Sequence, residues 1–459
     1  MGSGVTRGPR IWRAFTGGMH VPPRYIMKFR FTLTFCSLFL ALAVSADRTS
    51  APCRGCWLAS PDAPTIDQSF GVNIHFTDPQ PGEIKMIADA GFRWVRMDLK
   101  WELTESERGH YDFTPYDRLM TAIEPLGLRA MFILDYGNPL YGDGAPRTEE
   151  ARNAFARWAV AAAQHFANRG IMWEVYNEPN NAMFWQPTNA SEYASLAIAV
   201  GKAFRESVPN EKLMGPAVSE MDFSFLDSCF KAGPLDTWFA VSVHPYRRGD
   251  PENVAGDYAK LRELIAGYKT PGGSAEKKPT SSNIPIISGE WGYSAAWRGM
   301  NEEKQAMMLA RQFLTNAANG IPVSIWYDWR DDGLDPNEPE HHFGLVRHEY
   351  GNGQTQVYEP KPAYLAAKTL LRHFSGFRFE QRLLVGTDDD YVLVFAKDGE
   401  RRLAVWTTSP GKKQLKLSLP SGQFTITNMK GEDGGRVSSD QGALSIKLSN
   451  TPMYLAPVK

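Results

Sequence analysis

The strongest constraint on the fold is a regular alternation of strand-like and helix-like stretches between residues 69 and 376. Short apolar or aromatic runs, typical of buried strands, are each followed by an amphipathic stretch of helical length. The strand-like runs are 69–76, 93–101, 129–136, 171–176, 213–218, 238–244, 284–289 and 322–326. The helix-like stretches are 82–90, 115–126, 148–168, 192–207, 223–232, 253–268, 302–319 and 362–374. Eight such units predict an α/β fold of the closed (β/α)8 or TIM barrel type rather than an open doubly wound sheet.

The chain changes character after this region. Short alternating or apolar runs are separated by Gly, Pro and Asp at 392–395, 402–407, 414–419, 424–428 and 443–448. This pattern predicts a small C-terminal antiparallel β-sandwich, for which we expect a structural role. The predicted domains are an N-terminal extension with a signal peptide (1–46), an irregular segment (47–68), a catalytic barrel (69–376) and a β-sandwich accessory domain (377–459).

The N-terminal region has the features of a signal peptide. Basic Lys28 and Arg30 precede an apolar run at 31–44, and small residues end at Ala46. This arrangement predicts a start at Met27, cleavage near Ala46 and a secreted or periplasmic protein. No later apolar run is long enough to span a bilayer, so we expect no membrane span in the mature chain.

Several classes of function are excluded by composition and motif. The net charge is -1 and the chain has no clustered basic residues, which argues against nucleic acid as a partner. The chain contains no glycine-rich nucleotide loop after its first strand and no Walker motif. No His-x-His pair lies on that strand, and the acidic loop 331–336 lacks the spacing of a calcium loop. We therefore expect no cofactor and no metal.

The ends of the predicted strands carry polar side chains. Active sites of (β/α)8 barrels lie at the C-terminal ends of the strands, so these side chains should converge. At the end of the fourth strand stands Glu178, followed by Pro179. Proline ends a strand and biases the preceding residue toward extended geometry, which would hold the Glu178 carboxyl at the mouth of the barrel.

A second glutamate stands at an equivalent place. The seventh strand-like run ends at Glu290, which is followed by an aromatic residue and a glycine. Glycoside hydrolysis needs two carboxyl groups flanking one bond, one to protonate the leaving oxygen and one to attack the sugar or activate water. For Glu178 alone, the alternative is an ordinary loop carboxylate or ion-pair partner. Together, Glu178 and Glu290 indicate an oligo- or polysaccharide as substrate.

Three motifs resemble a known group of enzymes. The motif Trp-Glu-Val-Tyr-Asn-Glu-Pro-Asn at 173–180 resembles the fourth-strand motif of clan A retaining glycoside hydrolases. Val-His-Pro-Tyr at 243–246 and Ser-Gly-Glu-Trp at 288–291 are similar to the sixth- and seventh-strand motifs. The resemblance covers residues 69–376 and is closest to family 39, with family 5 nearly as close. It implies double displacement, with Glu178 as acid/base and Glu290 as nucleophile.

Four further residues are candidates for the site. Arg96, at the end of the second strand, is a natural charge partner for Glu290, although a structural ion pair is an equal alternative. Asn177 is placed to bind a sugar 2-hydroxyl, and Tyr246 to donate its hydroxyl to Glu290. His244 alternates with Tyr246 across a proline and is predicted to face the same mouth.

Aromatic side chains near strand ends are candidate platforms for sugar rings. Aromatic residues make up 12% of the chain, and large aromatic rings also dominate protein cores, so each candidate has a packing alternative. The candidates are Trp326, Trp329, Trp185 and Tyr136, with His75 in the same class.

These observations predict a secreted retaining O-glycoside hydrolase that cleaves a β-linked glycan or exopolysaccharide. One alternative is a catalytically silent carbohydrate-binding barrel. Within the enzyme class, an exo-acting β-xylosidase-like enzyme is the alternative to an endo-glycanase. Exo and endo action differ in how far loops close the mouth of the barrel. The loops at 136–144 and 330–342 are compatible with either.

Overall fold

The structure is a computed structural model that describes residues 64–268 and 284–458. The predicted signal peptide, the start at Met27, the cleavage near Ala46 and nearly all of the segment 47–68 lie outside the described residues. These expectations stay predictions.

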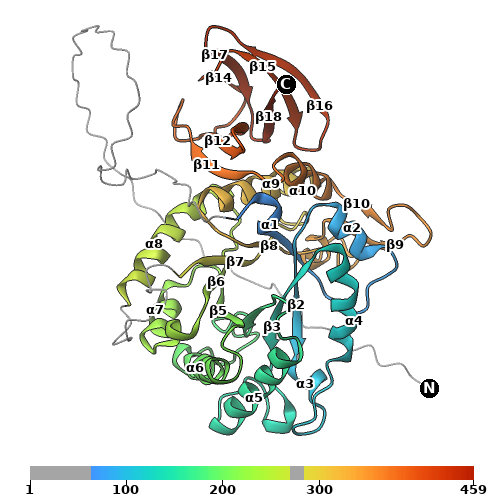
Figure 1. The fold of residues 1–459 in the computed structure, drawn as a ribbon, viewed down its shortest axis with the longest axis vertical. Coiled ribbons are helices and arrows are strands. Elements are labelled where there is room, and N and C mark those ends of the chain that lie inside the picture. The colour runs from blue at the N-terminus through green and yellow to red at the C-terminus, as the bar shows by residue number, and fades with distance from the viewer. Residues whose placement is uncertain (1–63, 269–283, 459) are drawn as a thin grey trace. The chain divides into compact units, whose positions relative to one another are not determined.

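Eight parallel strands form a closed barrel in the order of the sequence, which confirms the predicted fold (Figure 1). The strands are β1 Phe70–Asn73, β2 Trp94–Lys100, β3 Arg129–Asp135, β4 Met172–Val175, β5 Lys212–Ser219, β6 Ala240–His244, β7 Ile286–Trp291 and β8 Ser324–Trp326. Pairing of β1 with both β2 and β8 closes the cylinder.

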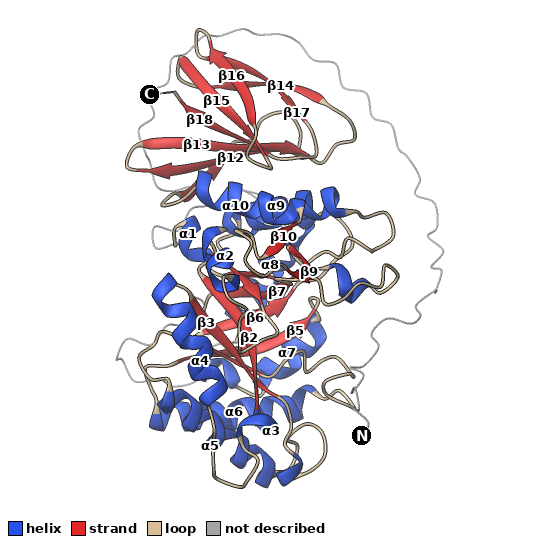
Figure 2. Cartoon of the chain, turned by 90° about the vertical axis from the view of Figure 1, so that its right-hand side faces the viewer, coloured by secondary structure: helices blue, strands red, loops and turns tan. Residues whose placement is uncertain are grey.

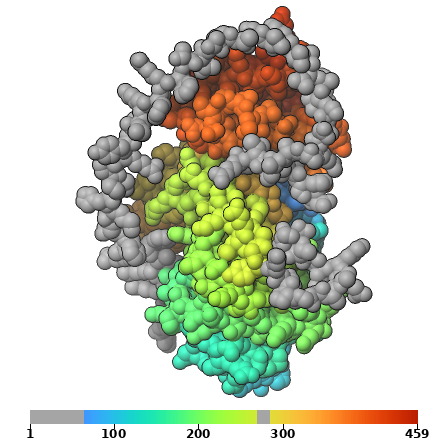
Figure 3. All heavy atoms as spheres, turned by 90° about the vertical axis from the view of Figure 1, so that its left-hand side faces the viewer, coloured from blue at the N-terminus to red at the C-terminus, as the bar shows by residue number. Residues whose placement is uncertain are grey.

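Helices surround the barrel and alternate with its strands. They are α1 Ile66–Ser69, α2 Glu83–Asp89, α3 Trp101–Thr104, α4 Thr114–Ile123, α5 Glu149–His165, α6 Ala190–Ser207, α7 Phe223–Lys231, α8 Val254–Gly267, α9 Glu302–Ala318 and α10 Pro362–His373. Local capping explains where several begin: the Thr148 hydroxyl accepts the amide of Ala151 at the start of α5, and the Asn301 side chain accepts the amide of Lys304 at the start of α9. The atoms of α6 to α8 form the green and yellow surface in Figure 3.

The barrel interior changes from apolar to polar along its axis. Its lower end is filled by a separate buried cluster contributed mainly by the early residues of the strands: Trp94, Met131, Met172, Met214, Ala240, Ile287, Val323 and Ile325. Because side chains alternate along a strand with a period of two, the residues two positions further on point to the same interior. On β2, β4 and β6 these are Arg96, Glu174 and Ser242, all of them buried. The barrel therefore carries a polar layer above an apolar base.

The last βα connection contains a hairpin that the sequence pattern did not predict. Strands β9 Val346–Tyr350 and β10 Tyr358–Pro360 pair antiparallel between β8 and α10.

The C-terminal region is an antiparallel sandwich, as predicted. Its six-stranded sheet has the order β11-β12-β13-β18-β15-β16, and β14 and β17 form a second sheet. The bounds are β11 Arg378–Arg382, β12 Asp390–Lys397, β13 Glu400–Thr407, β14 Lys413–Ser418, β15 Gly422–Asn428, β16 Asp433–Ser439, β17 Ala443–Leu448 and β18 Met453–Pro457. Aliphatic residues from both sheets, together with Phe424, form its own buried core.

The sandwich is joined to the barrel through α9 and α10, which lie between the barrel strands and the C-terminal sheets (Figure 2). The Trp406 indole donates to the Glu252 carboxylate at 2.6 Å, and Phe374 of the barrel region packs on Phe395 with ring centroids 4.4 Å apart. These rings belong to the same buried cluster as the helix and strand residues of the barrel. Within residues 64–268 and 284–458, no helix is both long and apolar enough to cross a membrane.

Candidate active site

Arg96 is the centre of the polar layer in the barrel. Its guanidinium is 1% exposed and donates to Glu174 at 2.6 Å and to Glu290 at 2.5 Å. It also donates to the side-chain oxygens of Asn73 and Asn177, both at 3.0 Å. Burial opposes the charge, but the two carboxylates outweigh it and raise the pKa of Arg96, so it stays a cation. The arginine thus connects side chains from four different parts of the barrel.

The predicted contact of Arg96 with Glu290 is present, and the alternative of a structural ion pair is also present. Glu174 is fully buried and accepts from both Arg96 and Ser242. A buried carboxylate is tolerated only when it is paired and hydrogen-bonded, and Glu174 is both. One guanidinium therefore binds a structural carboxylate and a carboxylate of the mouth.

Gly289 makes room for this arrangement. A Cβ atom at this position would lie 2.3 Å from the Ser242 hydroxyl and 2.6 Å from the Glu174 carboxylate. Both distances are far shorter than van der Waals contact. The glycine that precedes Glu290 is therefore required by the buried polar layer.

Glu178 follows β4 at the mouth of the barrel, but not in the predicted conformation. The expectation that Pro179 holds Glu178 extended is wrong, because its φ is 44° and lies in the left-handed region. The amide of Glu178 donates to the Ala217 carbonyl at 3.0 Å. This tertiary hydrogen bond supports a backbone conformation that proline disfavours for the residue before it.

The Glu178 carboxyl is 7% exposed and contacts two side chains. Its Oε1 is 3.0 Å from His244 Nδ1, and its Oε2 accepts from the Asn181 amide at 3.2 Å. On the other side of the imidazole, His244 Nε2 is 3.2 Å from the Arg96 guanidinium. Because a guanidinium can only donate, His244 Nε2 must accept, which assigns the imidazole proton to Nδ1. His244 therefore donates to Glu178.

This contact controls the acidity of Glu178. Burial alone would raise the pKa of the carboxyl, but the hydrogen bond that His244 donates outweighs it and lowers the pKa of Glu178 below its ordinary value.

Glu290 lies in β7 on the opposite side of the mouth. Its side chain is 12% exposed, so a small part of it contacts solvent. Its Oε2 accepts from Arg96 at 2.5 Å and its Oε1 from the Tyr246 hydroxyl at 2.7 Å. Both oxygens of Glu290 therefore accept a hydrogen bond, one of them from a cation.

The two glutamates face each other. One side-chain atom from each of Glu178, His244 and Glu290 forms a group in which all three atoms lie within 4.8 Å of one another. Retaining glycosidases have carboxyl groups about 5–5.5 Å apart, whereas inverting enzymes need about 6.5–9.5 Å to admit a water molecule. The spacing in this site is suited to direct attack on a sugar by one carboxylate.

The other predicted polar residues also gather here. Asn177 is 8% exposed and binds Arg96, while Tyr246 binds Glu290. Tyr136 is half-buried after β3 and stacks on Phe184 with an interplanar angle of 5°. His75 follows β1 and pairs with Asp328 at 3.4 Å. Loss of solvent around the ring opposes its protonation, but the neighbouring Asp328 carboxylate raises the pKa of His75 to about 9.

The expectation of tryptophan platforms is corrected by the structure. Trp185, Trp326 and Trp329 are each at most 1% exposed, so none presents a ring face to a ligand. The Trp326 indole donates to the Phe343 carbonyl, and the Trp329 indole to the Glu83 carboxylate. These rings pack inside the protein, as large aromatics usually do.

Two residues on the β8 side of the mouth were not predicted. Tyr327 is half-buried, and its hydroxyl donates to Glu340 Oε2 at 3.3 Å. Burial, followed by the charges of Glu290 and Asp332, raises the pKa of Glu340 to about 7. The sequence analysis expected the loop 330–342 to border the mouth but did not single out Glu340 within it. Tyr327 directly follows Trp326, whose ring we had expected to be exposed.

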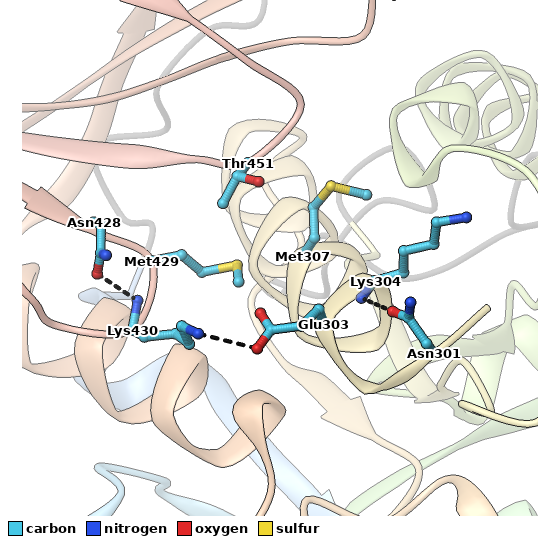
Figure 4. Close-up of a pocket in the computed structure, with 8 residues that line it drawn as sticks. All are labelled: Asn301, Glu303, Lys304, Met307, Asn428, Met429, Lys430 and Thr451. Carbon is cyan, nitrogen blue, oxygen red and sulfur yellow. Dashed lines mark hydrogen bonds and ion pairs between the residues drawn. The ribbon is translucent and has the colours of Figure 1, made fainter.

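Two grooves lie outside this constellation. One, of about 200 Å³, is formed by the loop after β3 and includes Tyr141, Asp143 and Arg147. The other, of about 230 Å³, lies between α9 and the sandwich and is lined by Met307, Met429 and polar side chains (Figure 4). Its lining contains no aromatic ring, so it lacks the usual platform for a sugar.

The chain is similar to known carbohydrate-active enzymes in its sequence. Residues 58–333 match the model of the family described as cellulase (glycosyl hydrolase family 5). A β-xylosidase of Geobacillus stearothermophilus is 27% identical over 379 residues, which cover 72% of this chain and 71% of that enzyme.

Solved structures have the same architecture. A family 39 glycoside hydrolase from Bacteroides cellulosilyticus WH2 has a TM-score of 0.73 at 25% identity, covering 87% of this chain and 83% of that one. A monomeric β-xylosidase from Caulobacter crescentus CB15 has a TM-score of 0.62 at 15% identity, covering 87% and 98%.

Proposed function

The chain belongs to the clan A glycoside hydrolases, with a match to the cellulase family (glycosyl hydrolase family 5) over more than half of its length, and we propose that it cleaves a β-linked glycan or exopolysaccharide with retention of configuration. The observation that carries this proposal is the face-to-face arrangement of Glu178 and Glu290 within 4.8 Å at the mouth of the barrel.

The partners of the two glutamates support their separate roles. Glu290 binds Arg96 and the Tyr246 hydroxyl, which stabilise a negative charge, so Glu290 is the nucleophile. Glu178 binds His244 and Asn181 and pairs with no arginine of residues 64–268 and 284–458, so it is the acid/base. Since His244 lowers the pKa of Glu178 in the free enzyme, substrate must exclude water from this carboxyl for it to hold its proton near neutral pH.

The reaction takes two displacements. In the first, Glu290 attacks the anomeric carbon and Glu178 gives its proton to the departing glycosidic oxygen. In the second, the Glu178 carboxylate takes a proton from water, which attacks the anomeric carbon and releases Glu290. Asn177, which Arg96 holds at the mouth, is placed to bind the sugar 2-hydroxyl.

For the substrate, the relative from G. stearothermophilus favours a second, narrower candidate. That protein is named a β-xylosidase, which supports an exo-acting, β-xylosidase-like activity for this chain. An endo-acting glycanase would release oligosaccharides of several sizes, whereas an exo-acting enzyme would release single sugars from one end. Product sizes from a panel of β-linked xylans, glucans and mannans distinguish them.

The chemical test uses an aryl β-glycoside and two variants. Glu290→Ala should lose more than about 10⁴-fold in kcat and recover turnover with azide, which fills the place of the lost carboxylate and yields the α-glycosyl azide. Glu178→Ala with azide should yield the β-glycosyl azide, because azide then attacks the glycosyl-enzyme. A wild-type enzyme that turns over no member of the glycan panel, yet binds glycans in calorimetry, would instead support a catalytically silent binding barrel.

We also propose that the protein is exported, on the basis of the signal-like residues 27–46. Expression of the full chain followed by N-terminal sequencing should find a mature chain that starts at Asp47. An intact N-terminus on protein retained in the cytoplasm would contradict this proposal.

A further inference from the structure

A second group of side chains lies beside the catalytic pair and has no part in the proposed reaction. His75 follows β1, Asp328 follows β8, and Asp332 belongs to the acidic loop after β8. One nitrogen or oxygen atom from each of the three residues lies within 4.8 Å of the others. The barrel therefore brings together residues that are more than two hundred positions apart in the sequence.

Asp328 is the unusual member of the group. Its side chain is 1% exposed, and neither carboxylate oxygen accepts a hydrogen bond from the described residues. A buried carboxylate without hydrogen bonds is costly, because it has lost the water that would otherwise donate to it. Asp328 therefore lacks the partners that such a group normally has.

The contact with His75 is too long to satisfy Asp328. The His75 nitrogen and the Asp328 oxygen are 3.4 Å apart, whereas a charge-assisted hydrogen bond would draw them to about 2.7–2.9 Å. Two ligands bound at about 2.0–2.2 Å to one tetrahedral ion are, in contrast, about 3.4 Å apart. The separation of 3.4 Å therefore leaves room for a cation bound by both atoms.

The chemistry of the ligands selects the ion. One imidazole and two carboxylates form a mixed nitrogen and oxygen set, which suits zinc and similar first-row divalent ions better than calcium. The two carboxylates balance the charge of such an ion, and the open side of His75 and Asp332 leaves a position for water.

We propose that His75, Asp328 and Asp332 bind one divalent transition-metal ion such as Zn²⁺ at the edge of the barrel mouth. The ion would join the end of β1 to the end of β8 and to the acidic loop. It would also lie near Tyr327, whose ring contacts the His75 ring with centroids 5.5 Å apart. The site is thus separate from the catalytic pair but adjoins the same mouth.

The test is calorimetric titration of ZnCl₂ into the full mature chain after dialysis against EDTA, with metal content measured by mass spectrometry. We expect one equivalent of zinc for the wild type. Asp332→Asn, at an exposed position, should weaken zinc binding by more than about 100-fold. Loss of a residue that only supports a metal ligand weakens binding by at most about 100-fold. Asp335→Asn is the matched control in the same loop and should bind as the wild type does.

Glu290→Gln distinguishes this site from the group formed by Glu178, His244 and Glu290. We expect it to keep one equivalent of zinc with an unchanged Kd. The proposal is overturned if the wild type binds no zinc. It is equally overturned if Asp332→Asn keeps wild-type binding, or if Glu290→Gln loses it.

Discussion

Tyr246 and His244 lie two residues apart at the end of β6, and each contacts a different glutamate of the pair. His244 Nδ1 is 3.0 Å from Glu178 and the Tyr246 hydroxyl is 2.7 Å from Glu290. The Tyr246 amide donates to the His244 carbonyl at 2.8 Å, so the chain turns at Pro245 and presents both side chains to the mouth. One short segment therefore sets the electrostatic environment of both carboxyls.

Removing the Tyr246 hydroxyl should slow catalysis. Tyr246→Phe deletes the hydrogen bond to Glu290 Oε1, and a hydrogen bond to a charged group contributes about 1.5–3 kcal/mol. We expect kcat/KM on an aryl glycoside to fall about 10–100-fold, with little change in Tm. Tyr268→Phe is the control, because its hydroxyl binds Asp227, far from the catalytic pair in the sequence and on an exposed part of the chain. An unchanged kcat/KM for Tyr246→Phe would contradict this role.

Replacing His244 should move the pH dependence in a defined direction. The alkaline fall of kcat/KM reports loss of the proton from the acid of the free enzyme, here Glu178. His244 lowers the pKa of Glu178, so His244→Phe leaves burial as the main effect and raises that pKa. The alkaline limb should therefore shift to higher pH.

The pH–rate profile of kcat/KM measures this shift. His165→Phe, which removes an imidazole bound to Asp117 on the outer surface, should leave the profile in place. A shift of the His244→Phe profile to lower pH would show that His244 does not lower the pKa of Glu178.

The sequence predicted the two glutamates, Arg96 and the contact of Tyr246 with Glu290. Each of these residues stands at a strand end, and strand ends converge at the mouth of a barrel. The sequence analysis placed the loop 330–342 at the mouth but did not single out Glu340, since a loop without a periodic pattern does not indicate which of its side chains faces the site. The tryptophans were misjudged for a related reason. Position at a strand end does not determine whether a ring turns toward the mouth or toward the helices.

Strand β7 has a requirement that periodicity alone does not reveal. It carries Glu290 to the mouth. The residue before Glu290, Gly289, must have no side chain, because Glu174 and Ser242 occupy that space. The buried polar layer and the position of the nucleophile are therefore coupled through the backbone of one strand.

Adding a methyl group to this strand should disturb both stability and activity. Gly289→Ala forces a Cβ into the space 2.3 Å from the Ser242 hydroxyl, and overpacking of this kind costs about 1–3 kcal/mol. We expect a lower midpoint of urea unfolding and a reduced kcat, because Glu290 moves away from Arg96. The control is Gly256→Ala in α8, where nothing lies within 4 Å and alanine should stabilise the helix by up to about 1 kcal/mol. Equal midpoints for the two variants would contradict the packing argument.

The eight barrel strands were predictable because each is a short apolar run between turn signals. Strand β16, Asp433–Ser439, was missed because most of its residues are exposed, so it has no apolar alternation. Strands β9 and β10 were missed because they form a short hairpin inside a connection between larger elements. Such strands are selected by pairing partners, and a single run of sequence does not contain that information.

At the scale of the molecule, a buried ionic contact joins the barrel to the sandwich. Glu252 is 5% exposed and accepts from Arg311 at 2.7 Å and from the Trp406 indole at 2.6 Å. Arg311 is itself 1% exposed. Removing Glu252 leaves the Trp406 indole without its acceptor and the buried Arg311 with Asp250, 2.9 Å away, as its remaining carboxylate partner.

Glu252→Ala should therefore destabilise the protein by about 3–5 kcal/mol. Calorimetry should show one unfolding transition for the barrel and sandwich together, at a lower Tm in the variant. Glu303→Ala is the matched control: it removes the exposed pair with Lys430, which crosses the same junction (Figure 4), and should cost less than about 1 kcal/mol. Two separate transitions in the wild type would contradict a shared core.

The contact of Trp406 with Glu252 also has a consequence for protein engineering. In a chimera, another carbohydrate-associated module would replace the sandwich. The barrel would then lose the Trp406 indole, which donates a hydrogen bond to Glu252. Grafting would succeed only if the incoming module supplied a comparable donor at that position, so this C-terminal part is not an interchangeable attachment.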